Sequence, residues 1–383
     1  IAGHLANAGI PSYLFDMDKE LAKKGKDTLT SLKPAPLYKP KNADIVTPCT
    51  YADDMEKIKE VDWVLEAVVE RLDIKEKVYS NLFPYLKDTA ILTSNTSGIP
   101  IKDLIKSLPE DLKKRFMITH FFNPPRYMQL LELVKGEKTS DKTYEEMVSF
   151  GELILGKGIV HAKDTPNFIG NRIGVFGMMT AINLATDHGL TIEEVDKLTG
   201  PISGRPKSAT FRTADVVGLD ILKNVSLTTF EKAPTDEERE MFEIPSILNT
   251  LIDSNRLGQK TKAGFYKKND DKSIHSIDLA TGEYSPMEKV KFDCFRIAKE
   301  KQDLSLKLIA LCDGDDRGSK YFWELTAKTL IYSANRIPEI SEDIVNIDNA
   351  MKWGFAWEAG PFEIWDMIGV QKSIDRMESE GKK

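Results

Sequence analysis

Four short segments between residues 94 and 172 hold the side chains of this 383-residue chain that are best suited to acid–base chemistry. The strongest candidate is His120, because an imidazole titrates near neutrality and can take a proton from an alcohol. A lone histidine is more often a core residue whose ring is satisfied by the backbone, so its neighbours decide between the two interpretations. The four segments are Ser94-Asn-Thr-Ser97, Thr119-His120-Phe-Phe-Asn123-Pro124, Leu131-Glu132-Leu-Val134 and Asp164-Thr-Pro-Asn-Phe-Ile-Gly-Asn171-Arg172.

Glu132 is flanked on both sides by leucines and a valine. A carboxylate in such an apolar strand lies on a solvated face or is buried with a partner, because burying it alone costs several kcal/mol. The prolines at 124 and 125 force a turn, after which residues 129–134 can return as a strand beside His120. Pairing with Glu132 would fix the tautomer of the imidazole and stabilise its protonated form.

Ser97 and Asn171 are neutral groups that could hydrogen-bond the oxygen of a substrate hydroxyl or carbonyl. Either residue alone could equally be a helix cap. A general base, an acid that orients it and two such groups together are the equipment of a dehydrogenase. The four other histidines have no acidic or thiol partner at useful spacing, and we interpret them as structural or surface residues: His4, His161, His188 and His275.

Short apolar runs alternate with helical patterns through the first 160 residues or so, which predicts a Rossmann-like, doubly wound and mostly parallel sheet in an α/β fold. The expected strands are 13–16, 44–47, 63–69, 90–94, 116–120, 129–134 and 159–162. Ligands of such sheets bind outside the carboxyl ends of the strands. Asp16, Glu70, Ser97 and His120 all lie at or just past those ends, which supports a shared site.

The chain opens with a helical pattern that ends at Gly9, followed by a strand that ends at Asp16. In a dinucleotide-binding fold, the first strand and its Gly-rich turn come immediately before such a helix, and the second strand ends in a carboxylate that binds a ribose. We therefore expect the parent protein to supply that central strand before Ile1. Without it, the sheet has two extra edges.

From Phe168 onward helical patterns dominate, and a weak internal repeat runs through them. Asp215-Val-Val-Gly218 is echoed by Asp366-Met-Ile-Gly369, Val195-Asp196 by Ile347-Asp348, and Asn171-Arg-Ile by Asn335-Arg-Ile. Two tandem copies of one helical unit would explain these echoes. The predicted division is a doubly wound domain at 1–163, a first helical copy at 164–266, a linker at 267–292 and a second helical copy at 293–383.

The composition is that of an ordinary globular protein, with 41% hydrophobic and 30% charged residues. A net charge of −7 provides no positive field for nucleic acid. The three cysteines are far apart and lack metal-ligand spacing, so we expect neither a disulfide framework nor a metal site, and we favour a reducing, cytoplasmic location. No apolar run approaches the roughly 18 residues of a membrane span.

With these residues in place, the chain resembles the 3-hydroxyacyl-CoA dehydrogenases of fatty-acid β-oxidation over nearly its whole length. The resemblance depends on the four segments above taken in order, and on Leu257-Gly-Gln-Lys-Thr-Lys-Ala-Gly-Phe-Tyr266. The doubled helical region, with Gly200-Pro-Ile-Ser-Gly-Arg-Pro206, is most similar to bacterial or archaeal multidomain members that also carry an enoyl-CoA hydratase module beyond the end of this chain.

The resemblance implies oxidation of an (S)-3-hydroxyacyl-CoA to the 3-ketoacyl-CoA, with hydride passing to NAD. It implies that His120 is the base, Glu132 its orienting acid, and Ser97 and Asn171 the groups that polarise the substrate. The implied cofactor contacts are Asp16 at the adenosine ribose, and Glu70, Lys75 and Asn123. An acid after the second strand favours NAD over NADP. Family members often form homodimers through the helical domain, although two tandem copies could satisfy that surface internally.

The chain departs from the family pattern in two places: the Gly-rich loop is absent, and the connector after Asp16 is shorter than the family's CoA-binding helical arm. Two other functions remain open. One is a two-domain dehydrogenase of a free 3-hydroxyacid, although such enzymes generally use a lysine base and none stands at position 120. The other is a non-catalytic acyl-CoA-binding module.

Overall fold

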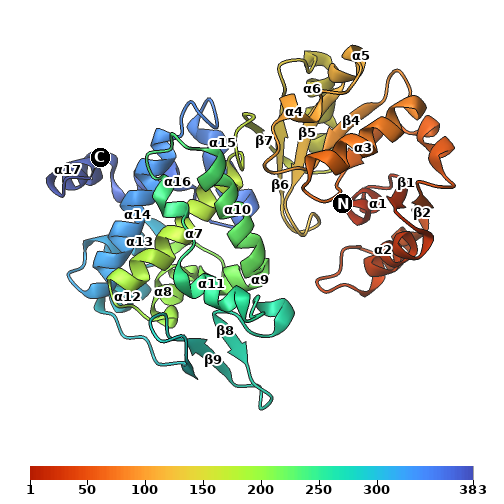
Figure 1. Cartoon of the computed structure of the whole chain (residues 1–383). Coiled ribbons are helices and arrows are strands. Elements are labelled where there is room, and N and C mark those ends of the chain that lie inside the picture. The colour runs from red at the N-terminus through yellow and green to blue at the C-terminus, as the bar shows by residue number, and fades with distance from the viewer. Residues whose placement is uncertain (383) are drawn as a thin grey trace. The chain divides into compact units, whose positions relative to one another are not determined.

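The computed structural model describes residues 1–382, and the chain divides into two compact units, Ile1–Phe168 and Ile169–Lys383. Figure 1 shows all the strands of the larger sheet in the first unit, whereas helices make up most of the second. The α/β fold predicted from the sequence, a Rossmann-like sheet followed by a helical domain, is confirmed. The predicted four-part division is finer than these two units and stays a prediction.

The first unit holds a five-stranded sheet in the order β3-β4-β5-β6-β7 and a separate pair, β1-β2. Strands β3, β4 and β5 are parallel, β6 runs antiparallel to β5, and β7 is parallel to β6. Strands β1 and β2 pair in parallel. The strands are β1 Ser12–Asp16, β2 Val46–Thr50, β3 Trp63–Glu66, β4 Ile91–Ser94, β5 Phe116–Phe121, β6 Leu130–Val134 and β7 Gly158–Ala162.

Within residues 1–382, β1 pairs only with β2, and β3 pairs only with β4. These are the two extra edges expected for a sheet without its central strand. Helix α1 (Ala2–Asn7) packs against both groups of strands. Its Leu5 contacts the core of the larger sheet, and its Ala6 belongs to a core with Val46 of β2.

Alternation along the strands decides which side chains face which layer, because successive residues of a strand point to opposite faces. Met117 and Phe121 of β5, with Leu131 and Leu133 of β6, pack in the core that also receives α1 and α6 (Asp141–Ser149). His120 and Glu132 have the opposite parity and share the other face of the sheet. The other helices of this unit are α2 Lys19–Ser31, α3 Leu72–Leu82, α4 Ile101–Leu104 and α5 Glu110–Lys113.

Five predicted strands agree with the structure to within one residue at each end, and two differ by more, each for a local reason. The strand predicted at 44–47 begins at Val46, because a 3-10 helix that starts at Pro40 occupies the preceding residues. The strand predicted at 63–69 ends at Glu66, where the carboxylate of Glu66 accepts a hydrogen bond of 2.7 Å from the backbone N–H of Val68. A side chain that bonds the backbone in this way competes with the pairing of a strand.

The second unit is mainly helical, with a small antiparallel sheet, β10-β9-β8, that extends from the helices (Figure 1). Its strands are β8 Tyr266–Lys268, β9 Ile274–Ile277 and β10 Tyr284–Pro286, within or next to the predicted linker. The helices are α7 Gly170–Asp187, α8 Ile192–Leu198, α9 Phe211–Val217, α10 Leu219–Lys232, α11 Ser246–Asp253, α12 Asp293–Lys299, α13 Leu304–Asp313, α14 Arg317–Asn335, α15 Ile344–Phe355, α16 Pro361–Ile368 and α17 Val370–Ser379.

Helices α7 to α10 and α14 to α17 follow the same order, and an aspartate occupies a matching place in each set. Asp196 of α8 accepts bonds from the N–H groups of Thr210 and Phe211, at the start of α9. Asp348 of α15 likewise accepts from Phe362 and Glu363 of α16. The third echo, between Asn171 and Asn335, is wrong, because Asn171 lies in the first turn of α7 and Asn335 is the last residue of α14.

Candidate functional site

His120 and Glu132 are direct cross-strand neighbours in the register of β5 and β6. Nδ1 of His120 lies 2.6 Å from Oε2 of Glu132. The carboxylate is fully buried, and His120 is only 8% exposed. In this geometry Nδ1–H donates to the carboxylate, which leaves Nε2 as the basic nitrogen. The turn and returning strand predicted from the two prolines therefore bring the two side chains together.

The rings of Phe122 and Phe168 pack edge-to-face against the imidazole of His120. Phe122 lies with its centroid 5.0 Å from that of the imidazole and Phe168 at 5.5 Å, both in edge-to-face arrangements. Within residues 1–382, Nε2 of His120 makes no hydrogen bond. An imidazole that is fixed by a carboxylate on one nitrogen and is free on the other can accept a proton from a bound hydroxyl.

Lys157 anchors the loop between β5 and β6. Its ammonium group is buried and donates to the carbonyl of Pro125 and, at 2.8 Å, to that of Met128. Burial lowers the pKa of Lys157 to about 8. The same loop is held from the other side by Arg126, which donates to the carbonyls of Ala35 and Leu37 at 2.6 and 2.7 Å. Sequence analysis missed Lys157, because it lies well past β6 in the chain and the fold alone brings it to this loop.

The loop that carries Ser97 is closed by contacts with Glu70 and with the segment before α7. Oε1 of Glu70 accepts a bond from the hydroxyl of Thr96 and, at 3.2 Å, from the N–H of Ser97. The carbonyl of Ser97 accepts from the N–H of Asn167 at 3.0 Å, and Asp164 accepts from the N–H of Ile101 at 2.9 Å. Parts of two of the predicted segments, 94–97 and 164–172, are thus joined within the first unit.

A buried carboxylate that sequence analysis missed, Glu66, lies under this loop. It pairs with the ammonium of Lys75 at 2.8 Å and accepts hydrogen bonds from Tyr79 at 2.8 Å and Ser94 at 2.7 Å. Lys75 is only 1% exposed and Glu66 only 3%. Burial and the charge of Glu66 raise the pKa of Tyr79. Glu66 ends a strand, as Asp16 does, and that position was the available signal.

The four residues predicted to contact the cofactor differ in exposure and in how many hydrogen bonds their side chains already make to the protein. Asp16 ends β1, and within residues 1–382 its carboxylate accepts from the N–H of Met17 and from no other group, so it fits an acceptor for ribose hydroxyls. Asn123 is exposed just beyond β5. Lys75 already donates to Glu66 and to the carbonyl of Val68, and it forms an ion pair with Glu70 at 3.3 Å. Its contact with a cofactor stays a prediction, and the geometry favours action through Glu70.

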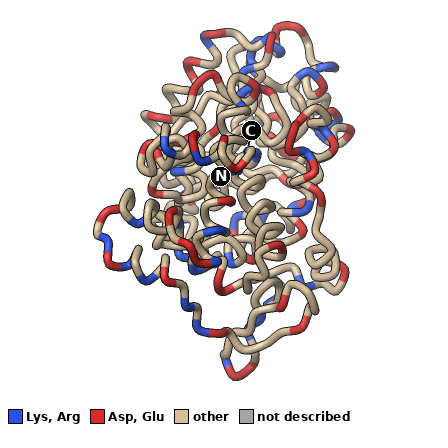
Figure 2. The backbone as a smooth tube through the Cα atoms, turned by 90° about the vertical axis from the view of Figure 1, so that its left-hand side faces the viewer, with Lys and Arg blue, Asp and Glu red and all other residues tan. Residues whose placement is uncertain are grey.

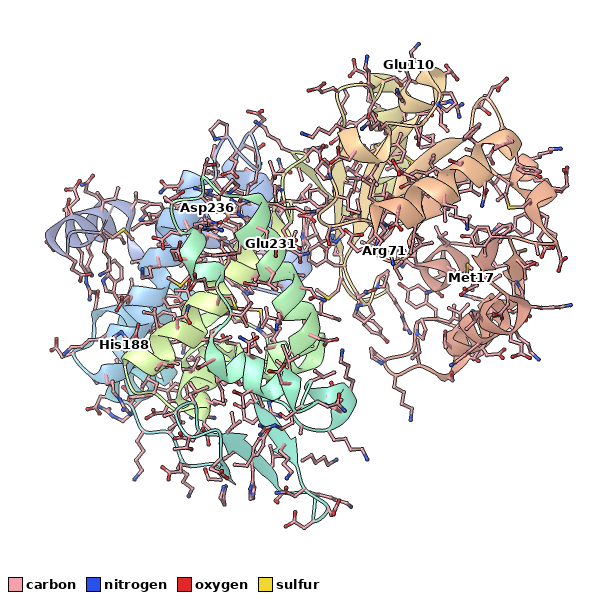
Figure 3. The ribbon with its side chains drawn as sticks, viewed as in Figure 1. Met17, Arg71, Glu110, His188, Glu231 and Asp236 are labelled. Carbon is pink, nitrogen blue, oxygen red and sulfur yellow. The ribbon has the colours of Figure 1, made fainter. Side chains whose placement is uncertain are left out.

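Asn171, the fourth predicted catalytic residue, lies in the first turn of α7, in the second unit. Its neighbour Arg172 is fully buried and donates to Asp236 at 2.5 Å and to the hydroxyl of Tyr332 at 2.6 Å. Asp236 is labelled in Figure 3. The arginine of the predicted segment thus has a structural role that fixes the start of α7, the helix that carries Asn171.

Figure 2 shows Lys and Arg interspersed with Asp and Glu along the backbone. Within residues 1–382, no group of three or more His, Cys, Asp or Glu side chains is arranged to hold a metal ion. Every helix in the described part of the chain is too short or too polar to traverse a lipid bilayer.

Two family models match the chain in succession. The model described as "3-hydroxyacyl-CoA dehydrogenase, NAD binding domain" matches residues 1–165, and the model described as "3-hydroxyacyl-CoA dehydrogenase, C-terminal domain" matches residues 168–268. The cofactor of this chain is therefore NAD, as predicted. The boundary between the two matches falls next to the division between the two compact units.

Curated relatives match the chain along much or all of its length. A probable 3-hydroxyacyl-CoA dehydrogenase of Bacillus subtilis is 44% identical over 100% of this chain and 51% of the relative. One of Deinococcus radiodurans is 43% identical over 71% of this chain and 80% of the relative. A fatty acid oxidation complex subunit alpha of Idiomarina loihiensis is 30% identical over 98% of this chain and 49% of the relative. The chain spans about half the length of two of these three relatives.

Solved structures agree with the fold. A 3-hydroxybutyryl-CoA dehydrogenase from Escherichia coli superposes with a TM-score of 0.73 over 100% of this chain and 92% of that one, at 19% identity, and so shows likeness of fold alone. The structure of FadB2 from Mycobacterium tuberculosis has a TM-score of 0.62 and 27% identity, over 70% of this chain and 94% of that one.

Proposed function

Because the chain belongs to the 3-hydroxyacyl-CoA dehydrogenase family, we propose that it oxidises an (S)-3-hydroxyacyl-CoA to the 3-ketoacyl-CoA in fatty-acid β-oxidation. The observation that carries this proposal is the buried pair of His120 and Glu132, 2.6 Å apart, with Nε2 of His120 left free. NAD, when bound, accepts the hydride that leaves the carbinol carbon of the substrate.

His120 is the proposed general base. Its Nε2 takes the hydroxyl proton of the substrate as the carbinol C–H bond breaks, and the imidazolium that forms is stabilised by the carboxylate of Glu132. The reverse reaction returns that proton to the carbonyl oxygen. Fixing the ring through Nδ1 ensures that only Nε2 can exchange this proton.

Ser97 and Asn171 are the proposed donors to the substrate oxygen. Two neutral donors stabilise partial negative charge on this oxygen without opposing the protonation of His120. Within residues 1–382 the hydroxyl of Ser97 has no hydrogen-bond partner, so it is available to a ligand. Asp16, Glu70 and Asn123 would hold NAD directly, and Lys75 would hold Glu70.

The proposed setting is cytoplasmic, with the parent protein carrying further modules. The three cysteines, Cys49, Cys294 and Cys312, are buried and free, as expected in a reducing compartment. Relatives about twice as long as this chain, one of them named as a fatty acid oxidation complex subunit, support an additional module such as an enoyl-CoA hydratase. A homodimer through the helical unit is a further part of the proposal.

The test is the reduction of acetoacetyl-CoA by NADH with the full-length protein and with His120→Gln. The variant should lose most of the rate, roughly 10²- to 10⁴-fold, which is the usual contribution of a general base. Its melting temperature should stay close to that of the wild type, since glutamine can still donate to Glu132. An active His120→Gln variant would disprove the role of His120 as the base.

The same assay separates this proposal from the two alternatives. A dehydrogenase of free 3-hydroxyacids would turn over 3-hydroxybutyrate better than its CoA thioester. A module that only binds acyl-CoA would show no NADH-dependent turnover with any of these substrates.

A further inference from the structure

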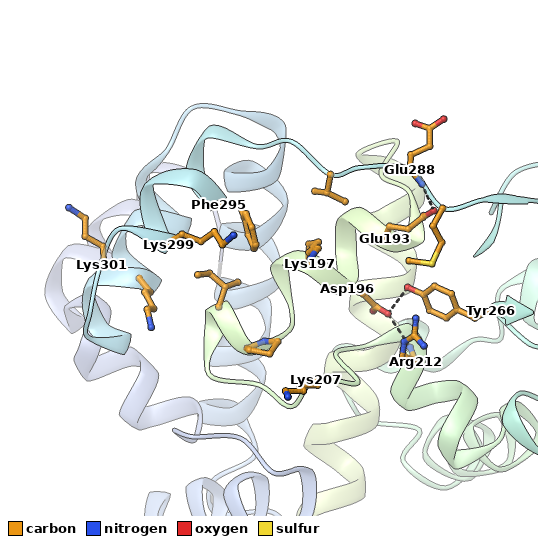
Figure 4. A pocket seen from close by; sticks show the side chains of 15 residues that line it. Glu193, Asp196, Lys197, Lys207, Arg212, Tyr266, Glu288, Phe295, Lys299 and Lys301 are labelled. Carbon is orange, nitrogen blue, oxygen red and sulfur yellow. Dashed lines mark hydrogen bonds between the residues drawn. The ribbon is translucent and has the colours of Figure 1, made fainter. Parts of the chain in front are cut away.

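We propose that the second unit contains a binding pocket for a nucleotide with two or more phosphates, far along the chain from the catalytic residues. Its walls are built by α8, the start of α9, β8, the segment 287–290, α12 and the start of α13 (Figure 4). The pocket has a volume of about 560 Å³, which falls in the range of small-molecule sites. This inference does not depend on the proposed dehydrogenase activity.

The charges around the pocket are the first argument. Six cationic side chains line it, against three carboxylates, in a chain whose net charge is −7. Within residues 1–382, none of the six forms an ion pair with a carboxylate. Four of the six are exposed and Arg212 and Lys307 are half-buried, so water screens their mutual repulsion in part, and a multiply charged anion bound among them would gain several cationic contacts at once. The six are Lys197, Lys207, Arg212, Lys299, Lys301 and Lys307.

Two acids of the pocket, the buried Glu193 and the half-buried Asp196, are already engaged in hydrogen bonds and, within residues 1–382, form no ion pair with the lysines. Asp196 accepts from three backbone N–H groups and, at 2.7 Å, from the hydroxyl of Tyr266. Burial raises its pKa to about 6. Glu193 accepts from the hydroxyl of Ser276 at 2.5 Å and from the N–H of Glu288 at 3.2 Å. The free donors of the pocket are therefore predominantly the ammonium groups.

The second argument is an aromatic ring among these ammonium groups. Phe295 of α12 has the ammonium of Lys299 5.4 Å from its ring centroid and that of Lys197 5.9 Å away. Pro201, Ile202 and Met287 add apolar lining. A planar base can stack on such a ring while its phosphates lie between the lysines, as nucleic-acid-binding sites combine stacking with cations. Inorganic phosphate alone would leave this apolar lining unused.

The chemistry fits two sources, a free nucleoside diphosphate and the phosphorylated nucleotide end of CoA. The first experiment maps lysine acetylation by mass spectrometry on the full-length protein, with and without ADP, CoA or pyrophosphate. ADP or CoA should slow acetylation of Lys197 and Lys299 at least fivefold, and leave the exposed lysines Lys272 and Lys320 of the same unit unchanged. Protection by CoA beyond that by ADP would identify CoA as the source, and the reverse would identify the free nucleotide.

The second experiment measures binding by calorimetry with a matched pair of variants. Lys197→Glu with Lys299→Glu should weaken ADP or CoA binding at this site more than tenfold. Lys272→Glu with Lys320→Glu makes the same change in net charge outside the pocket and should leave binding unchanged. Equal weakening by both variants, or no protection of Lys197 and Lys299, would overturn the pocket. Equal affinity for pyrophosphate and ADP would overturn the contribution of the ring.

Discussion

The pair of His120 and Glu132 could be predicted from the sequence, because a buried acid needs a partner and a histidine base needs an acid that orients it. Glu132 stands among leucines, so it needed a buried partner, and the prolines after Phe122 placed one candidate beside it. The structure confirms that the two side chains meet at 2.6 Å. Their catalytic roles, and those of Ser97 and Asn171, stay predictions that the acetoacetyl-CoA assay tests.

The ion pair of Glu66 and Lys75 shows where residue-level reasoning fell short. The resemblance assigned Lys75 to the cofactor, whereas in the structure its ammonium group donates to Glu66 and to the carbonyl of Val68 and pairs with Glu70. A buried lysine needs a buried acid. The sequence offered several acids within reach, and only the fold selects Glu66.

Glu66→Gln should therefore destabilise the first unit strongly. The change leaves the ammonium of Lys75 buried with only Glu70, 3.3 Å away, and breaking a buried pair costs about 3–5 kcal/mol. Urea denaturation followed by tryptophan fluorescence measures the loss. Glu56→Gln, which removes the acid of the exposed pair with Lys59, should leave the midpoint close to that of the wild type. Equal midpoints for both variants would show that Glu66 contributes no more than a surface acid.

At the scale of elements, the alternation of apolar runs predicted the strands well, because buried parallel strands are nearly continuous in apolar residues. What it could not predict was where pairing stops. β3 ends at Glu66 because a side chain captures the next free N–H, and β2 starts late because a 3-10 helix begins at Pro40. Both effects depend on single contacts rather than on periodicity.

The loop between β5 and β6 should depend on Lys157 for its shape. Lys157→Met removes the donor from the carbonyls of Pro125 and Met128 and lets the loop that joins His120 to Glu132 relax. We expect kcat for acetoacetyl-CoA reduction to fall by about tenfold, with a smaller change in KM, since a misplaced base slows the chemical step.

Lys142→Met is the control, because the side chain of Lys142 is 86% exposed on α6. It should leave both kinetic constants at their wild-type values. A Lys157→Met enzyme with unchanged kcat would show that the strands alone position His120.

Asp348, the buried aspartate of α15 that accepts bonds from the start of α16, should make the free energy of unfolding depend on pH. Burial raises the pKa of Asp348 from 3.8 to about 6. Between these values the folded chain holds a proton that the unfolded chain releases, so this contribution is fully present below about pH 4 and is lost as the pH rises through 6. Asp348→Asn removes the titration. The wild type should lose up to about 1.4 kcal/mol per pH unit relative to the variant over that interval.

Melting curves of both proteins at pH 4.5, 5.5 and 6.5 measure this difference. Asp375→Asn, on α17, is the control, because Asp375 is exposed and, within residues 1–382, accepts a hydrogen bond from Gln371 alone. A difference between wild type and Asp348→Asn that is the same at all three pH values would contradict the prediction.

At the scale of the whole molecule, the order of the elements was predictable and their packing was not. The sequence echoes predicted two helical copies, but they did not predict that α7 of the first copy approaches α15 of the second so closely. A Cβ at Gly174 would lie 2.0 Å from Cζ of Phe355. Nearby, Arg172 of α7 bonds Tyr332 of α14, and Phe176 stacks on that tyrosine at 3.7 Å.

Gly174→Ala should destabilise the second unit by about 1–3 kcal/mol, because the new methyl group collides with the ring of Phe355. Gly177→Ala on the same helix is a matched control. A Cβ there would have only Thr329 Oγ1 within reach, at 4.0 Å. Since alanine favours a helix over glycine by about 0.5–1 kcal/mol, the control should be neutral or stabilising.

The two variants are compared by thermal unfolding. Combining Gly174→Ala with Phe355→Leu should recover part of the loss, because a smaller side chain makes room for the methyl group. Equal melting temperatures for Gly174→Ala and Gly177→Ala would show that Phe355 can move aside at no cost.

The contact between Gly174 of α7 and Phe355 of α15 limits how the chain could evolve by duplication of its helices. Helix α7 leaves room at Gly174, and α15 contributes the ring of Phe355 that occupies it. If the two predicted copies are repeats of one unit, they are complementary at this contact rather than equivalent, although they follow the same order of helices. A third copy made by duplicating either one would lack its counterpart shape. Lengthening by repetition, which solenoid proteins achieve with interchangeable units, is closed to this pair.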